Sequence, residues 1–194
     1  MAPSVGLTLT DCLKENRMTT TAAVELDRER TDLLETLRQH RWFLTYTVQG
    51  LTDAQAAERT TVSELTLAGL IHHVAETEAQ WATFIVESPA AMEAEAATWT
   101  DPDADHTVRW RLRDGQTLAE ALAEYAEVAA RTDALVASLP SLDVDHQLPA
   151  APWFEPGKRW SARRVLLHLI AETSQHAGHA DILRESLDGQ KTMG

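Results

Sequence analysis

The feature that most constrains the fold of this chain is a run of mostly apolar side chains, spaced alternately four and three residues apart, near its middle. The run consists of Leu118, Leu122, Tyr125, Ala129, Thr132, Val136 and Leu139. Steps of three and four return to the same face of an α-helix, so the segment predicts a long helix with one buried side. No segment alternates apolar and polar residues as a half-buried strand would, so we expect other helices to cover this side.

Three further segments have helical character. The expected helices span residues 25–49, 63–87, 117–139 and 161–189. The first of them carries on one face Leu33, Leu37, Leu44 and Val48. Ser63 and Ser161 are expected to cap the second and fourth helices, and Gly189 to end the fourth. Thr117 and Glu120 have the spacing of a capping box at the start of the third helix.

The connections between these helices include two long ones. Residues 88–116 contain the breaker DPDAD and are expected to form a crossover loop. Residues 140–160 are rich in proline and aromatic residues, and we expect a structured loop there rather than a helix or regular strand. These features predict an all-α protein, a four-helix bundle with long crossover loops. Residues 1–24 are polar and aperiodic and are expected to be a flexible leader before a single domain over residues 25–194.

The charge and the cysteine content of the chain limit the kinds of partner and the cellular compartment that we expect. The net charge of −13 repels phosphate backbones and anionic lipid, so neither nucleic acid nor a membrane is expected as a partner. No apolar run has the roughly 18 residues needed to span a bilayer, and no signal peptide is apparent. Cys12 is the only cysteine, which excludes an intrachain disulfide and favours the reducing cytoplasm.

A column of polar side chains runs along the fourth helix in the stretch HLIAETSQHAGHADILRESLDG. Its members recur every three or four residues and are His168, Glu172, His176 and His179. The column continues the apolar stripe between Val165 and Leu183, so we predict that it lies on the core-facing side of the helix. An ionised glutamate buried there would cost several kcal/mol unless it were paired or bound a metal.

The second helix carries a pair of adjacent histidines, His72 and His73, in the stretch GLIHHVAETE. Two neighbours on a helix cannot both point inward, so one is expected to be solvated or to support the site from behind. His73 shares its face with Gly69, Thr77 and Gln80. One imidazole of this helix could meet the glutamate and histidine of the fourth, giving a metal site with an open coordination position, as in catalytic sites. Ordinary interior histidines and intrahelical contacts would explain the same pattern without a metal.

The stretch LAGLIHHVAETEAQW, followed about ninety residues later by the fourth-helix stretch, resembles the DinB-like superfamily. The resemblance covers roughly residues 27–189 and is specifically to its actinobacterial branch of mycothiol-dependent S-transferase-like proteins. It implies a four-helix bundle, often dimeric, that holds a divalent metal, with zinc expected here and nickel as the alternative. The implied ligands are His73, Glu172 and His176. His168 and His179 match recurrent positions of less settled role.

The resemblance predicts a metal-dependent transferase that conjugates a low-molecular-weight thiol such as mycothiol to an electrophilic small molecule, acting as a homodimer. His179 is the predicted catalytic residue, which either accepts the thiol proton or orients the metal-bound group. His168 is expected to support the ligand carboxylate of Glu172 through a hydrogen bond. Two alternatives stay open: a metal-dependent hydrolase that activates water, and a non-catalytic metal- or small-molecule-binding bundle.

Two smaller features also carry expectations. The loop aromatics Trp153, Phe154 and Trp160 either wall the mouth of a pocket or simply cover the end of the bundle, and the second role is slightly favoured. Asp181 and Arg184 are expected to form an intrahelical ion pair rather than a substrate clamp.

Overall fold

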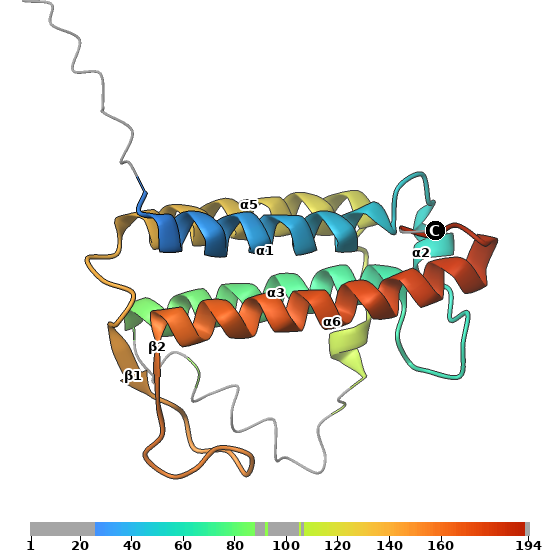
Figure 1. Ribbon diagram of the computed structural model, residues 1–194. Helices are drawn as coiled ribbons and strands as arrows, with labels where there is room; N and C mark the ends of the chain where they lie inside the picture. Colours follow the sequence, from blue (N-terminus) through green and yellow to red (C-terminus); the bar gives the residue numbers. More distant parts are fainter. Residues whose placement is uncertain (1–25, 88–91, 93–104, 106, 193–194) are drawn as a thin grey trace, which may run out of the picture.

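The computed structural model describes residues 26–87, 92, 105 and 107–192. The elements in these residues are α1 (Arg28–Tyr46), α2 (Asp53–Ala56), α3 (Leu67–Glu87), the 3₁₀ helix η1 (Val108–Trp110), α5 (Leu118–Ser138), β1 (Asp145–Gln147), β2 (Arg159–Ser161) and α6 (Ala162–Asp188). Figure 1 shows the four long helices in two layers, α1 with α5 and α3 with α6. The predicted all-α bundle is therefore confirmed. The predicted leader, residues 1–24, and much of the crossover loop lie outside the described residues.

The ends of α5 and α6 follow the caps expected from the sequence. The Thr117 hydroxyl accepts a hydrogen bond from the Glu120 backbone N–H, and the Glu120 side chain accepts one from the Thr117 N–H, which completes the capping box. Ser161 caps α6 through the N–H of Arg164. Gly189 ends α6 with a φ of +81°, a left-handed conformation that glycine adopts without strain.

The start of α3 differs from the prediction. Ser63 does not cap this helix, because its hydroxyl accepts a hydrogen bond from the Leu65 N–H within a local turn. The helix begins at Leu67 instead, and the Thr66 hydroxyl accepts from the Gly69 N–H at 3.0 Å. A threonine that caps a helix in this way satisfies one of the amides that no carbonyl can reach.

The loop between α5 and α6 contains a short antiparallel hairpin, which the prediction of no regular strand missed. Strands β1 and β2 pair Asp145 with Ser161 and His146 with Trp160. Each strand has only three residues, too few to show a repeating pattern in the sequence. Figure 1 shows the hairpin at the end of the bundle where α6 begins. Trp160, in β2, stacks on Trp81 of α3 with 4.9 Å between ring centroids.

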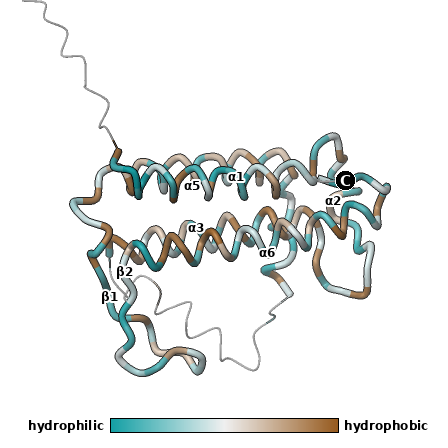
Figure 2. Tube along the Cα trace, viewed as in Figure 1, coloured by the Kyte–Doolittle hydropathy of each residue, from teal (hydrophilic) through white to brown (hydrophobic). Residues whose placement is uncertain are grey.

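The core lies between the two layers and is built mainly around α3, which is buried along most of its length. Figure 2 shows more strongly hydrophobic residues along α3 than along α1. The buried apolar residues form two clusters, one towards each end of the bundle. Among the helices that the structure describes, none combines the length and apolar character required to cross a membrane.

A buried ion pair lies in the core and was not predicted. Arg41 occupies the apolar stripe of α1, and its Nε atom donates to Glu78 Oε2 of α3 at 3.0 Å. Its Nη1 atom donates to Asp133 of α5 at 2.9 Å. Burial alone would lower the pKa of Arg41, but the bonds to Glu78 and Asp133 outweigh it and raise that pKa. Arg41 thus links three helices across the bundle, and its loss would leave the Glu78 carboxylate buried without its partner.

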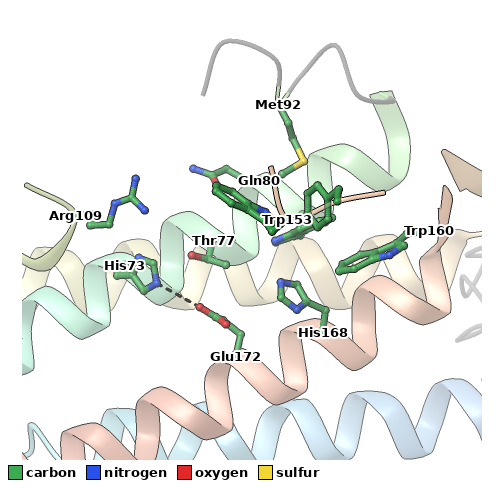
Figure 3. A pocket seen from close by; sticks show the side chains of 11 residues that line it. His73, Thr77, Gln80, Met92, Arg109, Trp153, Trp160, His168 and Glu172 are labelled. Atoms are coloured by element: carbon green, nitrogen blue, oxygen red, sulfur yellow. Dashed lines mark hydrogen bonds and ion pairs between the residues drawn. The ribbon is translucent and has the colours of Figure 1, made fainter. Parts of the chain in front are cut away.

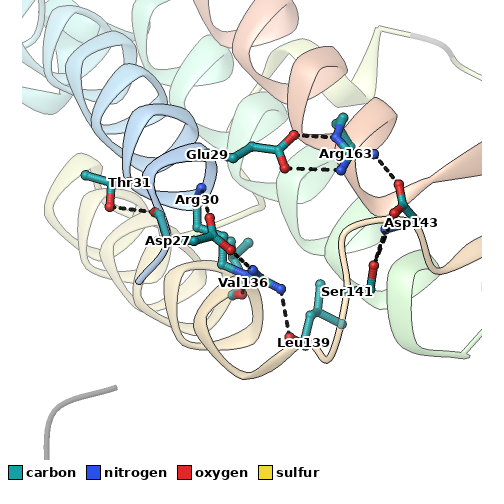
Figure 4. A network of polar contacts seen from close by, with 9 residues as sticks. All are labelled: Asp27, Glu29, Arg30, Thr31, Val136, Leu139, Ser141, Asp143 and Arg163. Atoms are coloured by element: carbon teal, nitrogen blue, oxygen red, sulfur yellow. Dashed lines mark hydrogen bonds and ion pairs between the residues drawn. The ribbon is translucent and has the colours of Figure 1, made fainter. Parts of the chain in front are cut away.

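Polar contacts at one end of the bundle join α1 to both helices that meet it there (Figure 4). Arg163 at the start of α6 pairs with Glu29 of α1 and with Asp143 of the preceding loop. Arg30 of α1 donates from Nη2 to the carbonyl of Leu139 at 2.9 Å, where α5 ends. Arg163 lowers the pKa values of both of its carboxylate partners. The ion pairs of Arg163 are exposed, so they orient the helix ends more than they stabilise the fold.

Candidate metal centre

Three side chains from α3 and α6 meet on the outer side of this helix pair: His73, Glu172 and His176. The Nε2 atoms of the two histidines lie 3.4 Å and 3.1 Å, respectively, from the same carboxylate oxygen, Oε1 of Glu172. One donor atom from each residue lies within 4.8 Å of the other two. We call these three side chains the donor cluster. The structure thus brings together the three residues that the sequence marked as ligands.

The donor cluster has the geometry and chemistry of a site for a divalent cation. Ligands bound to zinc at about 2.0–2.1 Å in tetrahedral directions are roughly 3.4 Å apart, close to both observed nitrogen–oxygen distances. Two imidazoles with one carboxylate form a donor set that suits zinc and nickel. Three protein ligands leave at least one position open, whereas a structural zinc site is closed by four.

The electrostatics of the donor cluster favour the protonation states that a cation needs. Hydrogen bonds from His176 and His73 lower the pKa of the Glu172 carboxyl far below its usual value. Burial lowers the pKa of His73, although the contact with Glu172 opposes this effect. At neutral pH the carboxylate is therefore ionised and His73 is neutral, as metal ligands must be.

His72 does not belong to the donor cluster. Its side chain is only 6% exposed, and its Nε2 atom lies 3.3 Å from Oε1 of Glu76, one turn further along α3. The expectation of a solvated second histidine is therefore wrong, and the described contact of His72 is with Glu76 rather than with the donor cluster. Neighbouring side chains on a helix point about 100° apart, so His72 is buried on a different side of α3 from His73.

The polar column of α6 lies at the edge of the core. The prediction that it would lie on the core-facing side of the helix is therefore corrected. Glu172 keeps 24% of its side chain exposed, whereas the adjacent Thr173 is 1% exposed and faces the core. Each step of four residues turns 40° beyond a full helical turn, so a column spaced by fours drifts away from the stripe. Of the four column residues, His176 is the one that is buried, with 6% of its surface exposed.

A pocket of about 520 Å³ opens beside the donor cluster (Figure 3). His73 and Glu172 form part of its wall, so the exposed side of the donor cluster faces this space. The loop aromatics Trp153, Phe154 and Trp160 also line the pocket. The sequence slightly favoured a role for these aromatics in covering the end of the bundle. The structure shows the alternative role, in which they form part of the pocket wall.

The two other histidines of the column have different surroundings. His168 lines the pocket and contacts the ring edges of Trp81 and Trp160, with centroids 5.0 Å and 5.2 Å away. Burial lowers its pKa, and among its described contacts there is no hydrogen bond to Glu172. His179 lies behind the donor cluster, with its Nδ1 atom 3.4 Å from Nδ1 of His176. It is not among the described residues that line the pocket.

The segment that carries η1 covers the donor cluster and was not singled out by the sequence. The ring of Trp110 lies 4.3 Å from that of His73 and 5.7 Å from that of His176, measured between centroids. Gly69 allows this approach, because a Cβ there would lie 1.7 Å from the Trp110 carbonyl oxygen. The same oxygen accepts a hydrogen bond from the Thr66 hydroxyl at 3.2 Å. The one available signal was the tryptophan itself, but residues 88–116 contain two, Trp99 and Trp110, and the sequence does not tell them apart.

Near the end of α6, Arg184 makes a different ion pair from the one expected. It pairs with Asp188, four residues further on, rather than with Asp181. It also donates from Nη1 to the carbonyls of Thr47 at 2.7 Å and Gln49 at 3.0 Å. These bonds satisfy carbonyls at the end of α1, so Arg184 ties α6 to α1 and has a structural role.

Comparison with known proteins gives one match. The family model described as Mycothiol-S-transferase matches residues 32–189, a range that contains the whole donor cluster and the residues around its pocket. No curated protein and no solved structure matches the chain significantly.

Proposed function

The chain belongs to the mycothiol-S-transferase family, and on this premise we propose that it is a metal-dependent enzyme that conjugates mycothiol to an electrophilic small molecule. The family supports thiol transfer in general. The donor cluster supports the metal, because its three ligand atoms lie within 4.8 Å of one another beside a pocket large enough for a small molecule. We propose zinc as the cation, with nickel as the alternative for the same donor set.

The chemistry that a cation would supply is a lowered pKa for the thiol, so that the nucleophilic thiolate is present near neutral pH. The protein has to hold the ligands in place and keep water away. The contact between the Nδ1 atoms of His179 and His176 would fix the orientation of the ligand ring, a role typical of residues behind a metal ligand. We therefore favour a positioning role for His179 over acceptance of the thiol proton.

The wall of the pocket suits a polar thiol and an electrophile with a flat apolar ring. Thr77 and Gln80 of α3 offer a hydroxyl and an amide on one side. Trp153 and Trp160 offer flat apolar surfaces that would exclude water from the reacting groups (Figure 3).

The test is conjugation of mycothiol to monochlorobimane, followed by the fluorescence of the product. We expect zinc- or nickel-loaded protein to accelerate the reaction and chelated protein to lose that acceleration. His176→Ala should behave like chelated protein, and His72→Ala, outside the donor cluster, should retain the activity. Metal-loaded protein that accelerates no conjugation would contradict the proposal and leave the hydrolase and the non-catalytic binder as the remaining candidates.

We also propose a homodimer in a reducing cytoplasm. Leu167 and Ile182 are 48% and 60% exposed on α6 and offer an apolar surface for a second copy. The chain has one cysteine, Cys12, and its thiol substrate must stay reduced. Light scattering should give about twice the chain mass of 21.5 kDa, and Ile182→Glu should give the monomer mass. A wild-type monomer would contradict the dimer without affecting the proposed chemistry.

A further inference from the structure

One cation in the pocket, Arg109, differs in its contacts from the arginines that follow it. Arg109 of η1 lines the pocket and is partly buried. It makes no hydrogen bond or ion pair with any residue that the structure describes. The next two arginines along the chain are both paired: Arg111 contacts Asp105, and Arg113 contacts Glu124. Glu172 is the one acidic side chain among the described residues that line the pocket, and its carboxylate is held by His73 and His176. In a chain with a net charge of −13, an arginine left without such a contact suggests a ligand that supplies a negative charge of its own.

We propose that Arg109 binds a carboxylate of the electrophilic substrate, so that the enzyme prefers acidic aromatic electrophiles. The inference rests on the proposed function and names its substrate class. A guanidinium presents two parallel N–H groups that match the two oxygens of a carboxylate, and such paired bonds fix the direction of a ligand as well as its affinity.

The positions of the pocket residues explain why the ligand should be aromatic. Figure 3 shows Arg109 and His73 at one end of the pocket and Trp160 at the other, with Trp153 and Glu172 between them. A flat ring that stacks on the tryptophans and directs a carboxylate towards Arg109 must pass over the donor cluster. The electrophilic carbon of the ring would then lie next to the position expected for the thiol sulfur.

The reaction can be written for an aryl halide of this class. The thiol first loses its proton to solvent, and the thiolate sulfur then attacks the ring carbon that carries the halogen. A carbon–sulfur bond forms, the carbon–halogen bond breaks, and halide leaves with the bonding electrons. Arg109 takes no part in these bond changes, and its role is to bind and orient the acid.

The test compares two probes with the same ring and leaving group, 4-chloro-3-nitrobenzoate and 4-chloro-3-nitrobenzamide. In Arg109→Gln the ratio of kcat/KM for the acid to that for the amide should fall roughly 10- to 100-fold, as expected for loss of a charge-assisted hydrogen-bonded pair. Arg109→Lys keeps the charge without the planar fork and should give an intermediate ratio. Arg111→Gln, two residues away on the same segment, is the matched control and should keep the wild-type ratio.

Binding without turnover separates this inference from the proposed function. Quenching of tryptophan fluorescence by each probe is measured on chelated protein, where the acid cannot bind through a metal. Arg109→Gln should weaken binding of the benzoate and not of the benzamide, even if no conjugation is ever observed. Equal effects on both probes would overturn the inference. A change confined to the KM of mycothiol would also overturn it, because the anion would then belong to the thiol substrate.

Discussion

Replacement of Gly69 by alanine is expected to push the η1 segment away from α3 and so to loosen the cover of the candidate metal centre. A Cβ at this position would lie 1.7 Å from the carbonyl oxygen of Trp110 and 2.2 Å from its carbonyl carbon. Ordinary contact begins near 3.4 Å, so the backbone of η1 would have to move by about 1.7 Å. The neighbouring atoms belong to the backbone, which cannot rotate aside as a side chain can.

The expected loss of stability follows from three opposing contributions. Alanine in a helix is favoured over glycine by about 1 kcal/mol, which would stabilise the variant. Overpacking of a close contact costs about 1–3 kcal/mol. Movement of Trp110 also breaks the hydrogen bond that its carbonyl accepts from the buried Thr66 hydroxyl, a further loss of about 1 kcal/mol. We expect Gly69→Ala to destabilise the fold by about 1–3 kcal/mol, which lowers Tm by roughly 2–12 °C in a domain of this size.

Gly178 provides the matched control on α6. It is exposed, and a Cβ there would meet no atom within 4 Å, so Gly178→Ala should raise stability by about 0.5–1 kcal/mol. Thermal melts of both variants, followed by circular dichroism, compare the two effects directly. Metal affinity, measured by competition with a chromophoric chelator, should fall in Gly69→Ala because Trp110 no longer holds the ring of His73. If Gly69→Ala melts above the wild type, as Gly178→Ala should, then η1 does not rest on α3 as described.

Three further predictions concern the metal and the core. His73→Ala should remove most of the bound metal and His72→Ala much less, as measured by elemental analysis; the reverse order would show that the wrong histidine was assigned. A chelator should lower the Tm of the wild type, because a metal at a hundredfold excess over Kd adds about 2.7 kcal/mol to the free energy of unfolding. The same chelator should hardly change the Tm of Glu172→Gln. An unchanged wild-type Tm after verified metal removal would contradict a stabilising metal site. Arg41→Met should cost about 3–5 kcal/mol in urea unfolding, and Glu78→Gln added to it should recover part of that loss; full additivity of the two changes would contradict a coupled pair.

Much of the fold could be predicted because helices of a bundle carry a periodic stripe. Four positions of the α5 stripe are buried as expected: Leu118, Tyr125, Thr132 and Val136. Leu122 and Ala129 are only partly buried, and the neighbouring residues Ala121 and Val128 are buried instead. The hairpin was missed because strands of three residues show no period. The start of α3 was misplaced because Ser63 and Thr66 are both acceptable caps, and only the turn around Ser63 decides between them.

The site could be predicted in its residues but not in its surroundings. Glu172 and His176 stood out because they have the side chains of metal ligands at helical spacing, and both properties are visible in the sequence. The choice of His73 over His72 rested on the resemblance to DinB-like proteins. Arg109 and Trp110 were missed because they reach the site from a loop, and contacts between distant segments have no local signature.

On α6, adjacent residues point to the core and to the candidate metal site. A change in core packing would therefore also move the metal ligands. Thr173 faces the core beside Glu172, which faces the pocket. A slide of α3 by one residue along α6 would move a donor by about 1.5 Å, enough to spoil nitrogen–oxygen distances of 3.1–3.4 Å. Apolar contacts alone tolerate such slides, whereas a buried charged pair has one register in which it is satisfied. We therefore infer that Arg41 and Glu78 set the position of α3 within the bundle, so loss of this pair should weaken metal binding as well as stability.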